Sequence, residues 1–263
     1  MQILQRMIRE QVVRLVGDES EAPATWAGPG LFPPHAVCRT VHGDFTTMLT
    51  GGVAALAGVW DHSNFRQDTT GRLKRTAQFL AGTTYGSAGE AERLIARIRA
   101  IHDHVHGVLP DGTPYSANDP ALLTWVHIAG VRSFLEAYLR HGRAHLSPRD
   151  QDRYYAETSL IAYRLGATSV PETRRAVEEY LAEMRPQLRV DARTREVARV
   201  LMRQRAPSAG LAPFRDVVMQ SAVGLLPPWA ARMHGLHVPE LRRPALDLSI
   251  RGFGALTRWA LQG

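Results

Sequence analysis

HSNF at residues 62–65 opens the stretch that decides the fold, and GRLKRT at 71–76, RAIH at 99–102, DGTPYSA at 111–117 and WVH at 125–127 continue it. In this stretch, polar side chains recur at helical intervals inside segments that are otherwise apolar. Arginine, threonine and histidine are costly to bury unless another group satisfies them. Two such sets, on two successive predicted helices, indicate that a bound group lies buried between those helices.

The fold class predicted outward from this stretch is all-α, a single globular multi-helix domain with a pocket between core helices. Apolar residues recur at helical spacing along almost the whole chain, and strand-like alternation is scarce. We expect residues 1–43 to hold an N-terminal helix and a Pro/Gly-rich connector, and residues 44–263 to form one all-α domain. Helices are expected at residues 3–16, 44–60, 68–81, 87–106, 118–141, 147–166, from 171 onward, 190–205, 216–225 and 246–261, with a turn or short hairpin at 110–118.

Capping residues set several of these limits, because short polar side chains satisfy the first free N–H groups of a helix. The expected N-caps are Asp68 or Thr70, Ser87 with Glu90 in capping-box spacing, and Asn118 with Pro120 in the first turn. The helix that begins after Ser87 is predicted to continue to about His106, where Gly107 stops it.

Composition argues against a nucleic-acid partner. The chain has 263 residues, a formal net charge of +7 and an isoelectric point near 10.1. Its basic residues are spread among acidic ones without a run of five or more. Lys74 is the only lysine, so the charge reflects a general preference for arginine. We find no sequence pattern of a known nucleic-acid-binding module.

Cysteine content and hydropathy bear on the location of the protein. Cys38 is the only cysteine, which excludes an internal disulfide and a cysteine-based zinc site and favours a reducing compartment. Residues 1–17 lack the apolar core of a signal peptide, and no segment has the roughly 20 apolar residues of a membrane span. We therefore expect a cytoplasmic protein without a transmembrane segment. Contact of the first or last helix with a membrane surface, and the oligomeric state, stay open.

The sharpest local cluster consists of His102, His104 and His106. On a helix, His102 and His106 share a face and could hold one metal ion, although no His-Glu-x-x-His pattern accompanies them. A second interpretation places His104 and His106 at an exposed helix end, near the C-terminal dipole. His102, flanked by isoleucines and a valine, is either a core histidine bonded to the backbone or the ligand of a cofactor.

Arg72, Arg75 and Thr76 lie on one helical face by their spacing. They form either an exposed basic stripe or a set of groups that face a bound anion or gas ligand. Arg99 lies one turn before His102, so a cofactor bound to His102 would bring a carboxylate near Arg99.

His127 lies in an apolar, aromatic segment and either packs in the core or lines a pocket. Other chemistries lack their motifs. The chain has no Gly-x-Ser-x-Gly elbow, no phosphate-binding loop and no Gly-x-Gly-x-x-Gly after a strand. A single cysteine also excludes covalent haem attachment through Cys-x-x-Cys-His, and no motif supports ligation of iron by Cys38.

Taken in order, these motifs resemble the MpaB and rubber-oxygenase (latex-clearing-protein) family of haem b oxygenases. The resemblance covers about residues 45–188 and depends on the ordered set of motifs, since no single one is decisive. The matching segments are GVWDHSNF at 58–65, GRLKRT at 71–76, IRAIH at 98–102, Gly-x-x-x-Asp-Gly-x-x-Tyr-x-Ala from Gly107, DP at 119–120, WVH at 125–127, LSP at 146–148 and YYAE at 154–157.

The resemblance implies haem b held noncovalently between core helices, with His102 as the proximal ligand of the iron. The Arg-x-x-Lys-Thr element of the family falls on Arg72, Arg75 and Thr76, which would be the catalytic side chains. In rubber-cleaving members the lysine can occupy the distal iron position. Arginine stands here instead and does not readily lose its proton. We therefore expect an open or water-occupied distal site in which Arg75 or Arg72 donates to dioxygen. The expected cofactor-binding residues are His102, Arg99, His127 and Arg72.

A second departure from the family is the segment that follows Gly51-Gly52, which is shorter than in other members and either opens the pocket or compromises it. The resemblance implies a haem-dependent oxygenase that activates dioxygen to oxidise an apolar, isoprenoid or aromatic small molecule or to cleave its C=C bond. Two alternatives stay open: a haem-binding sensor or carrier without catalysis, and a helical interaction protein without a cofactor. No motif identifies the substrate or the electron source.

Overall fold

The computed structural model describes residues 53–64, 66–141, 146–203 and 212–261. Several sequence-based expectations lie outside the described residues. These are the helix at 3–16, the Pro/Gly-rich connector, Cys38 and the glycine pair at 51–52.

The all-α prediction is confirmed over these ranges. The helices are α3 (Val53–His62), α4 (Thr69–Tyr85), α5 (Ala88–His102), α6 (Pro120–His141), α7 (Pro148–Leu165), α8 (Arg174–Met184), α9 (Ala192–Met202), α10 (Ala212–Leu225), α11 (Pro228–His234) and α12 (Arg243–Leu261). Short 3₁₀ turns occupy Arg185–Gln187 and Glu240–Arg242. Strands β1 (His106–Val108) and β2 (Pro114–Ser116) pair antiparallel, with His106 opposite Ser116, and form a hairpin that begins before the expected one at 110–118.

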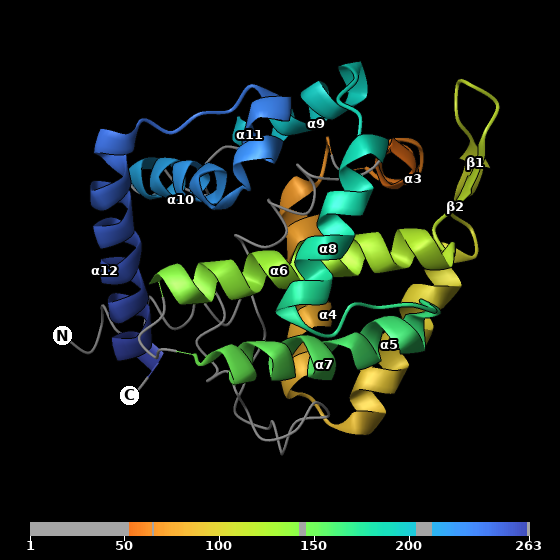
Figure 1. Cartoon of the computed structure of the whole chain (residues 1–263), viewed down its shortest axis with the longest axis horizontal. Coiled ribbons are helices and arrows are strands. Elements are labelled where there is room, and N and C mark those ends of the chain that lie inside the picture. The colour runs from red at the N-terminus through yellow and green to blue at the C-terminus, as the bar shows by residue number, and fades with distance from the viewer. Residues whose placement is uncertain (1–52, 65, 142–145, 204–211, 262–263) are drawn as a thin grey trace.

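Helix α6 runs through the middle of the molecule and packs against α3, α7, α10 and α12 (Figure 1). Trp125 and Ile128 on this helix are fully buried and join a core cluster with Tyr155 of α7 and Val177 of α8. A second cluster, which includes Val197 of α9, fills the space between α9, α10 and α11. Because α6 carries apolar residues on several sides, it can serve as the shared core of the domain.

Local caps fix the ends of several helices as the sequence predicts. The side chain of Asp68 accepts a hydrogen bond from the Gly71 backbone N–H at the start of α4. Ser87 caps α5 by accepting from the Glu90 backbone N–H. At α6, however, the expected cap Asn118 is wrong. The Asp119 carboxylate accepts from the first backbone N–H groups of that helix, whereas Asn118 donates to Asp103.

The prediction that α5 continues to His106 is also wrong, because the helix ends at His102. His106 belongs instead to β1, where it pairs with Ser116. Gly107 permits this pairing, since a Cβ atom at that position would lie 2.8 Å from the Tyr115 hydroxyl oxygen. The hydrogen bonds between β1 and β2 and the packing of Tyr115 on Gly107 therefore replace the last helical turn that the sequence predicted. Helix α11, which follows Pro227, was not anticipated.

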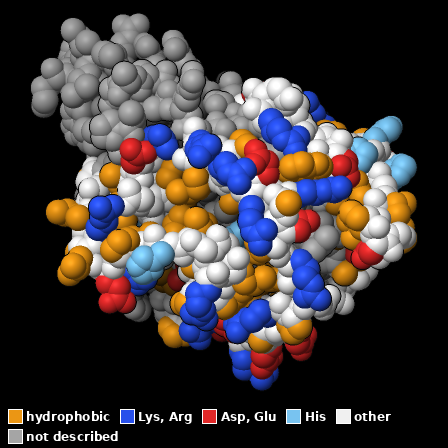
Figure 2. Space-filling model, turned by 90° about the horizontal axis from the view of Figure 1, so that it is seen from above, with side chains coloured by type: hydrophobic (Ala, Val, Ile, Leu, Met, Phe, Trp, Pro, Cys, Tyr) orange, Lys and Arg blue, Asp and Glu red, His pale blue; other side chains and the backbone are white. Residues whose placement is uncertain are grey.

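The surface agrees with the charge pattern of the sequence. Figure 2 shows Lys and Arg side chains spread between hydrophobic ones over the face seen from above. No helix in the described part of the chain is both long and apolar enough to span a membrane.

Candidate functional site

Helices α4 and α5 form an antiparallel pair joined by the short segment at Gly86-Ser87. Arg72 lies in the first turn of α4, and His102 is the last residue of α5. The two residues therefore lie at the same end of the pair. Figure 1 shows the helices diverging towards that end from the turn that joins them. Arg72 and His102 thus lie at the end of the pair where the two helices are farthest apart.

Arg72 is half-buried and its Nη1 donates a 2.7 Å hydrogen bond to the Ser63 hydroxyl oxygen. Ser63 follows α3 directly, so this bond ties the end of α3 to the start of α4. One turn further along α4, the hydroxyl of Thr76 donates to the backbone carbonyl of Arg72 at 3.2 Å. Its oxygen retains acceptor capacity. Arg72 and Thr76 thus form a compact pair of polar groups on one helical face.

The side chain of Arg75 lies in a different environment from those of its two neighbours. Its Nη1 lies 3.2 Å from Oδ2 of Asp68, and its side chain is 56% exposed. The other oxygen of Asp68 caps α4, so the carboxylate is fixed from two sides. The structure therefore holds the Arg75 guanidinium at the surface. Any contact of Arg75 with a ligand requires this ion pair to open.

His102 is half-buried, and its Nδ1 is buried without a hydrogen-bond partner among the described residues. Burial lowers the pKa of this imidazole below 6.5, while the nearby Asp103 carboxylate opposes that shift. The ring is therefore neutral at pH 7 and keeps a nitrogen lone pair. A neutral imidazole is the form that binds a metal ion.

His127, about two turns into α6, is half-buried, and its Nε2 is buried without a partner within the described ranges. Burial lowers its pKa to about 4, so it is also neutral at pH 7. The start of α6 is tied to the end of α5 by the 2.6 Å hydrogen bond from Asn118 to Asp103. Since a helix rises about 1.5 Å per residue, His127 lies roughly 10 Å along α6 from this junction.

Arg99 is exposed, and its Nη1 donates to the backbone carbonyl of Arg164 at the end of α7, at 3.3 Å. Arg164 is in turn paired with Glu92. The Arg99 guanidinium thus contributes to the junction of α5 and α7. Arg72 and Thr76 of α4 and His102 of α5 lie towards the end of this helix pair at which the two helices diverge, whereas Arg99 is engaged with α7.

The idea that His102 and His106 share a helical face is wrong, because His106 lies in β1, beyond the end of α5. His104 is exposed, and its Nδ1 donates to the Ala100 carbonyl at 2.9 Å, as expected at a helix end. No group of three or more His, Cys, Asp or Glu residues positioned to hold a metal ion occurs in the part of the chain that the structure describes.

Sequence reasoning missed the residues that support this end of the fold. The Tyr115 hydroxyl of the hairpin donates to Asp61 at 2.9 Å, and His62 donates to the backbone carbonyl of His106 at 3.1 Å. Both contacts join the end of α3 to the segment that follows His102. HSNF and the tyrosine of the hairpin belong to the sequence motifs. That Asp61 and His62 hold the hairpin against α3 depends on long-range contacts, which the motifs do not reveal.

The comparisons with known proteins give one family. The model of the family described as "ER-bound oxygenase mpaB/B'/Rubber oxygenase, catalytic domain" matches residues 39–259, which is most of the chain. No curated protein and no solved structure matches the chain. The family match spans all the residues that the sequence motifs had singled out.

Proposed function

Because this chain belongs to the mpaB and rubber-oxygenase catalytic-domain family, we propose that it is a haem b-dependent oxygenase acting on an apolar small molecule. The observation that carries the proposal is the pair of half-buried, neutral histidines, His102 and His127, each with a buried ring nitrogen that has no partner among the described residues. An unpaired buried polar atom is costly in a folded protein. A bound group that pairs with it would remove this cost.

The residues present fit a haem. His102 would hold the iron, because its lowered pKa keeps the imidazole neutral. His127 would line the pocket, where a neutral ring adds no charge to an apolar site. When bound, haem supplies the oxygen chemistry, and the protein contributes binding, orientation and electrostatics.

Arg72 and Thr76 would contribute to the site from α4, and His102 from α5. The hydrogen bond to Ser63 restrains the Arg72 guanidinium. Its N–H groups would therefore meet a ligand in a fixed orientation. Fixed donors stabilise negative charge that develops on dioxygen without having to reorganise. Thr76, anchored on the Arg72 carbonyl, would set the shape of the site beside it.

Arg75 and Arg99 are not the leading donors in this proposal, because both side chains are engaged elsewhere. Arg75 could replace Arg72 as the donor only after leaving Asp68. Arg99 could reach a haem carboxylate only after leaving the Arg164 carbonyl. We assign the leading donor role to Arg72 because it is half-buried, whereas Arg75 and Arg99 are exposed.

Oxygen consumption tests the proposal directly. Purified protein loaded with haem would be supplied with squalene, an isoprenoid probe that contains C=C bonds, and dioxygen uptake and carbonyl products would be measured. We expect uptake that depends on squalene, falls about 100-fold in Arg72→Gln, and falls less in Arg75→Gln. Haem-loaded protein that consumes no dioxygen with this or an aromatic probe would favour a sensor or carrier. A larger loss in Arg75→Gln than in Arg72→Gln would reverse the two roles.

A further inference from the structure

A cavity of about 390 Å³ lies beside the C-terminal half of α6, where this helix meets α10, α11 and the start of α12. Arg132, Glu136 and Arg140 line it from α6. They are spaced four residues apart and so share one helical face. Its volume is at the lower end of the range of small-molecule sites. The cavity can therefore hold a small ligand.

This cavity is separate from the candidate oxygenase site. None of Arg72, Thr76, His102 and His127 lines it. Its other walls come from the segment that connects α10 to α11 and from the residues before α12.

The charged lining of the cavity is mainly positive. It contains four arginines, namely Arg132, Arg140, Arg232 and Arg243, and one carboxylate, Glu136. Apolar side chains, among them Leu226 and Val238, complete the walls. The cavity therefore has a region lined by arginines and a region lined by apolar side chains.

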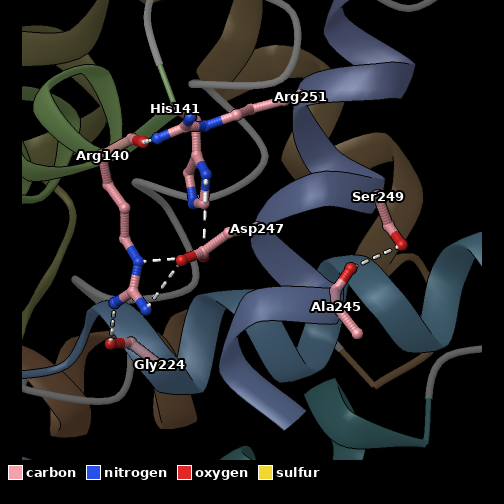
Figure 3. Close-up of polar contacts among 7 residues, drawn as sticks. All are labelled: Arg140, His141, Gly224, Ala245, Asp247, Ser249 and Arg251. Atoms are coloured by element: carbon pink, nitrogen blue, oxygen red, sulfur yellow. Dashed lines mark hydrogen bonds and ion pairs between the residues drawn. The ribbon is translucent and has the colours of Figure 1, made fainter.

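Two of the arginines are held in place. Arg140 donates to both carboxylate oxygens of Asp247 and to the backbone carbonyl of Gly224, as Figure 3 shows. Arg132 is only 16% exposed and donates from Nε to Glu178 at 3.0 Å. Within the described ranges no acceptor is recorded for the terminal amino groups of Arg132. One wall of the cavity is thus fixed by two arginines that are each paired with a carboxylate.

The other two arginines are exposed at the cavity. Arg232 of α11 and Arg243 at the start of α12 have no recorded hydrogen bond or ion pair with a residue that the structure describes. Arginine presents several N–H donors in a planar fork that matches a carboxylate or phosphate. Arg232 and Arg243 bring two such forks to a cavity whose lining contains one carboxylate, that of Glu136, so the cavity carries positive charge in excess.

We propose that this cavity binds a small amphipathic anion, a carboxylate or phosphate head group that carries a short hydrocarbon chain. The head group contacts the forks of Arg232 and Arg243, and the chain lies against the apolar wall. Arg140 keeps its bonds to Asp247 and Gly224, so the wall is preformed. The site does not depend on haem or on dioxygen.

Isothermal titration with octanoate, at concentrations below its micellar range, tests this proposal. Octanol keeps the chain without the charge, and inorganic phosphate keeps a charge without the chain. We expect octanoate to bind more tightly than either probe and to weaken as salt is added, since salt screens exposed charges. The double variant Arg232→Gln/Arg243→Gln should lose about tenfold or more in affinity, about 1.4 kcal/mol by the tenfold rule.

Arg195→Gln serves as the matched control, because Arg195 is an exposed arginine of α9 that does not line the cavity. It should bind octanoate as the wild type does. The proposal is overturned if octanoate does not bind, if octanol or phosphate binds as tightly, or if the double variant binds unchanged. Haem-loaded and haem-free protein should bind octanoate equally. Loss of octanoate binding on haem loading would overturn the separation of the two sites.

Discussion

Two histidines of α6 have buried ring nitrogens but differ in the groups that surround them. His127 lies near the start of the helix and His141 is its last residue, and burial lowers the pKa of each to about 4. His141 lies 3.9 Å from the carboxylate of Asp247, which Arg140 also binds. Figure 3 shows how this cluster joins α6 to α12.

No charged group contributes to the pKa of His127, whose shift has burial as its only cause. The C-terminal end of α6 therefore holds its histidine within a charged network that connects helices. The N-terminal half keeps a neutral histidine whose pKa no charged group shifts, about two turns from the junction of α6 with the end of α5. We interpret the first arrangement as structural and the second as the wall of a binding site.

The largest expected effect is on the pH dependence of stability. A folded pKa of about 4, below the ordinary 6.5, means that the unfolded state binds the proton first as pH falls. Each histidine should therefore lower the free energy of unfolding by on the order of 3 kcal/mol between pH 7 and pH 4. Urea unfolding at both pH values would show a smaller pH-dependent loss in His127→Phe and in His141→Phe.

His104→Phe is the control for this pair, because His104 is exposed. Its pH-dependent loss should match that of the wild type. If the free energy of unfolding of His127→Phe falls between pH 7 and pH 4 as much as that of the wild type, the pKa of His127 is not lowered in the folded protein. His127 would then differ from His141 in its protonation.

The next effect concerns the charged network. Asp247→Ala removes the acceptor of a bidentate arginine whose side chain is 29% exposed, so we expect a loss of about 1–3 kcal/mol in the free energy of unfolding. Asp216→Ala is the comparison, because the Asp216 carboxylate pairs with Arg215 and is 57% exposed. It should lower the free energy of unfolding by less than about 0.5 kcal/mol. Urea denaturation at pH 7 would measure both variants. Equal losses of free energy of unfolding would contradict a stabilising role for the cluster of Arg140, His141 and Asp247.

A smaller effect is expected where a neutral hydroxyl, rather than a carboxylate, holds an arginine. Ser63→Ala removes the 2.7 Å acceptor of Arg72 and should lower the free energy of unfolding by about 1 kcal/mol. It should also reduce the rate of dioxygen uptake, because Arg72 loses its tether. Ser169→Ala, at an exposed serine, is the control. Unchanged activity in Ser63→Ala would show that the tether does not position Arg72.

The smallest effect is expected at Arg75. Its ion pair with Asp68 is largely exposed to solvent, so Arg75→Ala should change the free energy of unfolding by less than about 0.5 kcal/mol. Thermal unfolding followed by circular dichroism would measure the difference. A loss above 1 kcal/mol would mean that Arg75 is not the surface residue described here.

The parts of the fold that the sequence could predict are those decided by neighbouring residues. Asp68, Ser87 and Ser147 cap their helices, and Gly166 ends α7 in the left-handed conformation, because each motif acts within one helical turn. Helical spacing likewise placed Arg72 and Thr76 on one face.

The errors arose where distant residues decide the outcome. The pairing of His106 with Ser116 ends α5 early. The side chain of Asn118 donates to Asp103, 15 residues before it in the chain, and Asp119 caps α6 instead. The contact between Arg72 and Ser63, and the engagement of Arg75 by Asp68 and of Arg99 by α7, depend on side-chain positions that periodicity does not encode.

The central claim is that His102 holds a haem, and the visible absorption spectrum tests it most directly. Wild-type protein, His102→Ala and His104→Ala would be purified after expression with added haem, and the Soret band and haem content compared. We predict a Soret band in the wild type and in His104→Ala, and its loss or a marked change in His102→Ala. No Soret band in the wild type, even after reconstitution with haem, would contradict the account, as would an identical spectrum in His102→Ala.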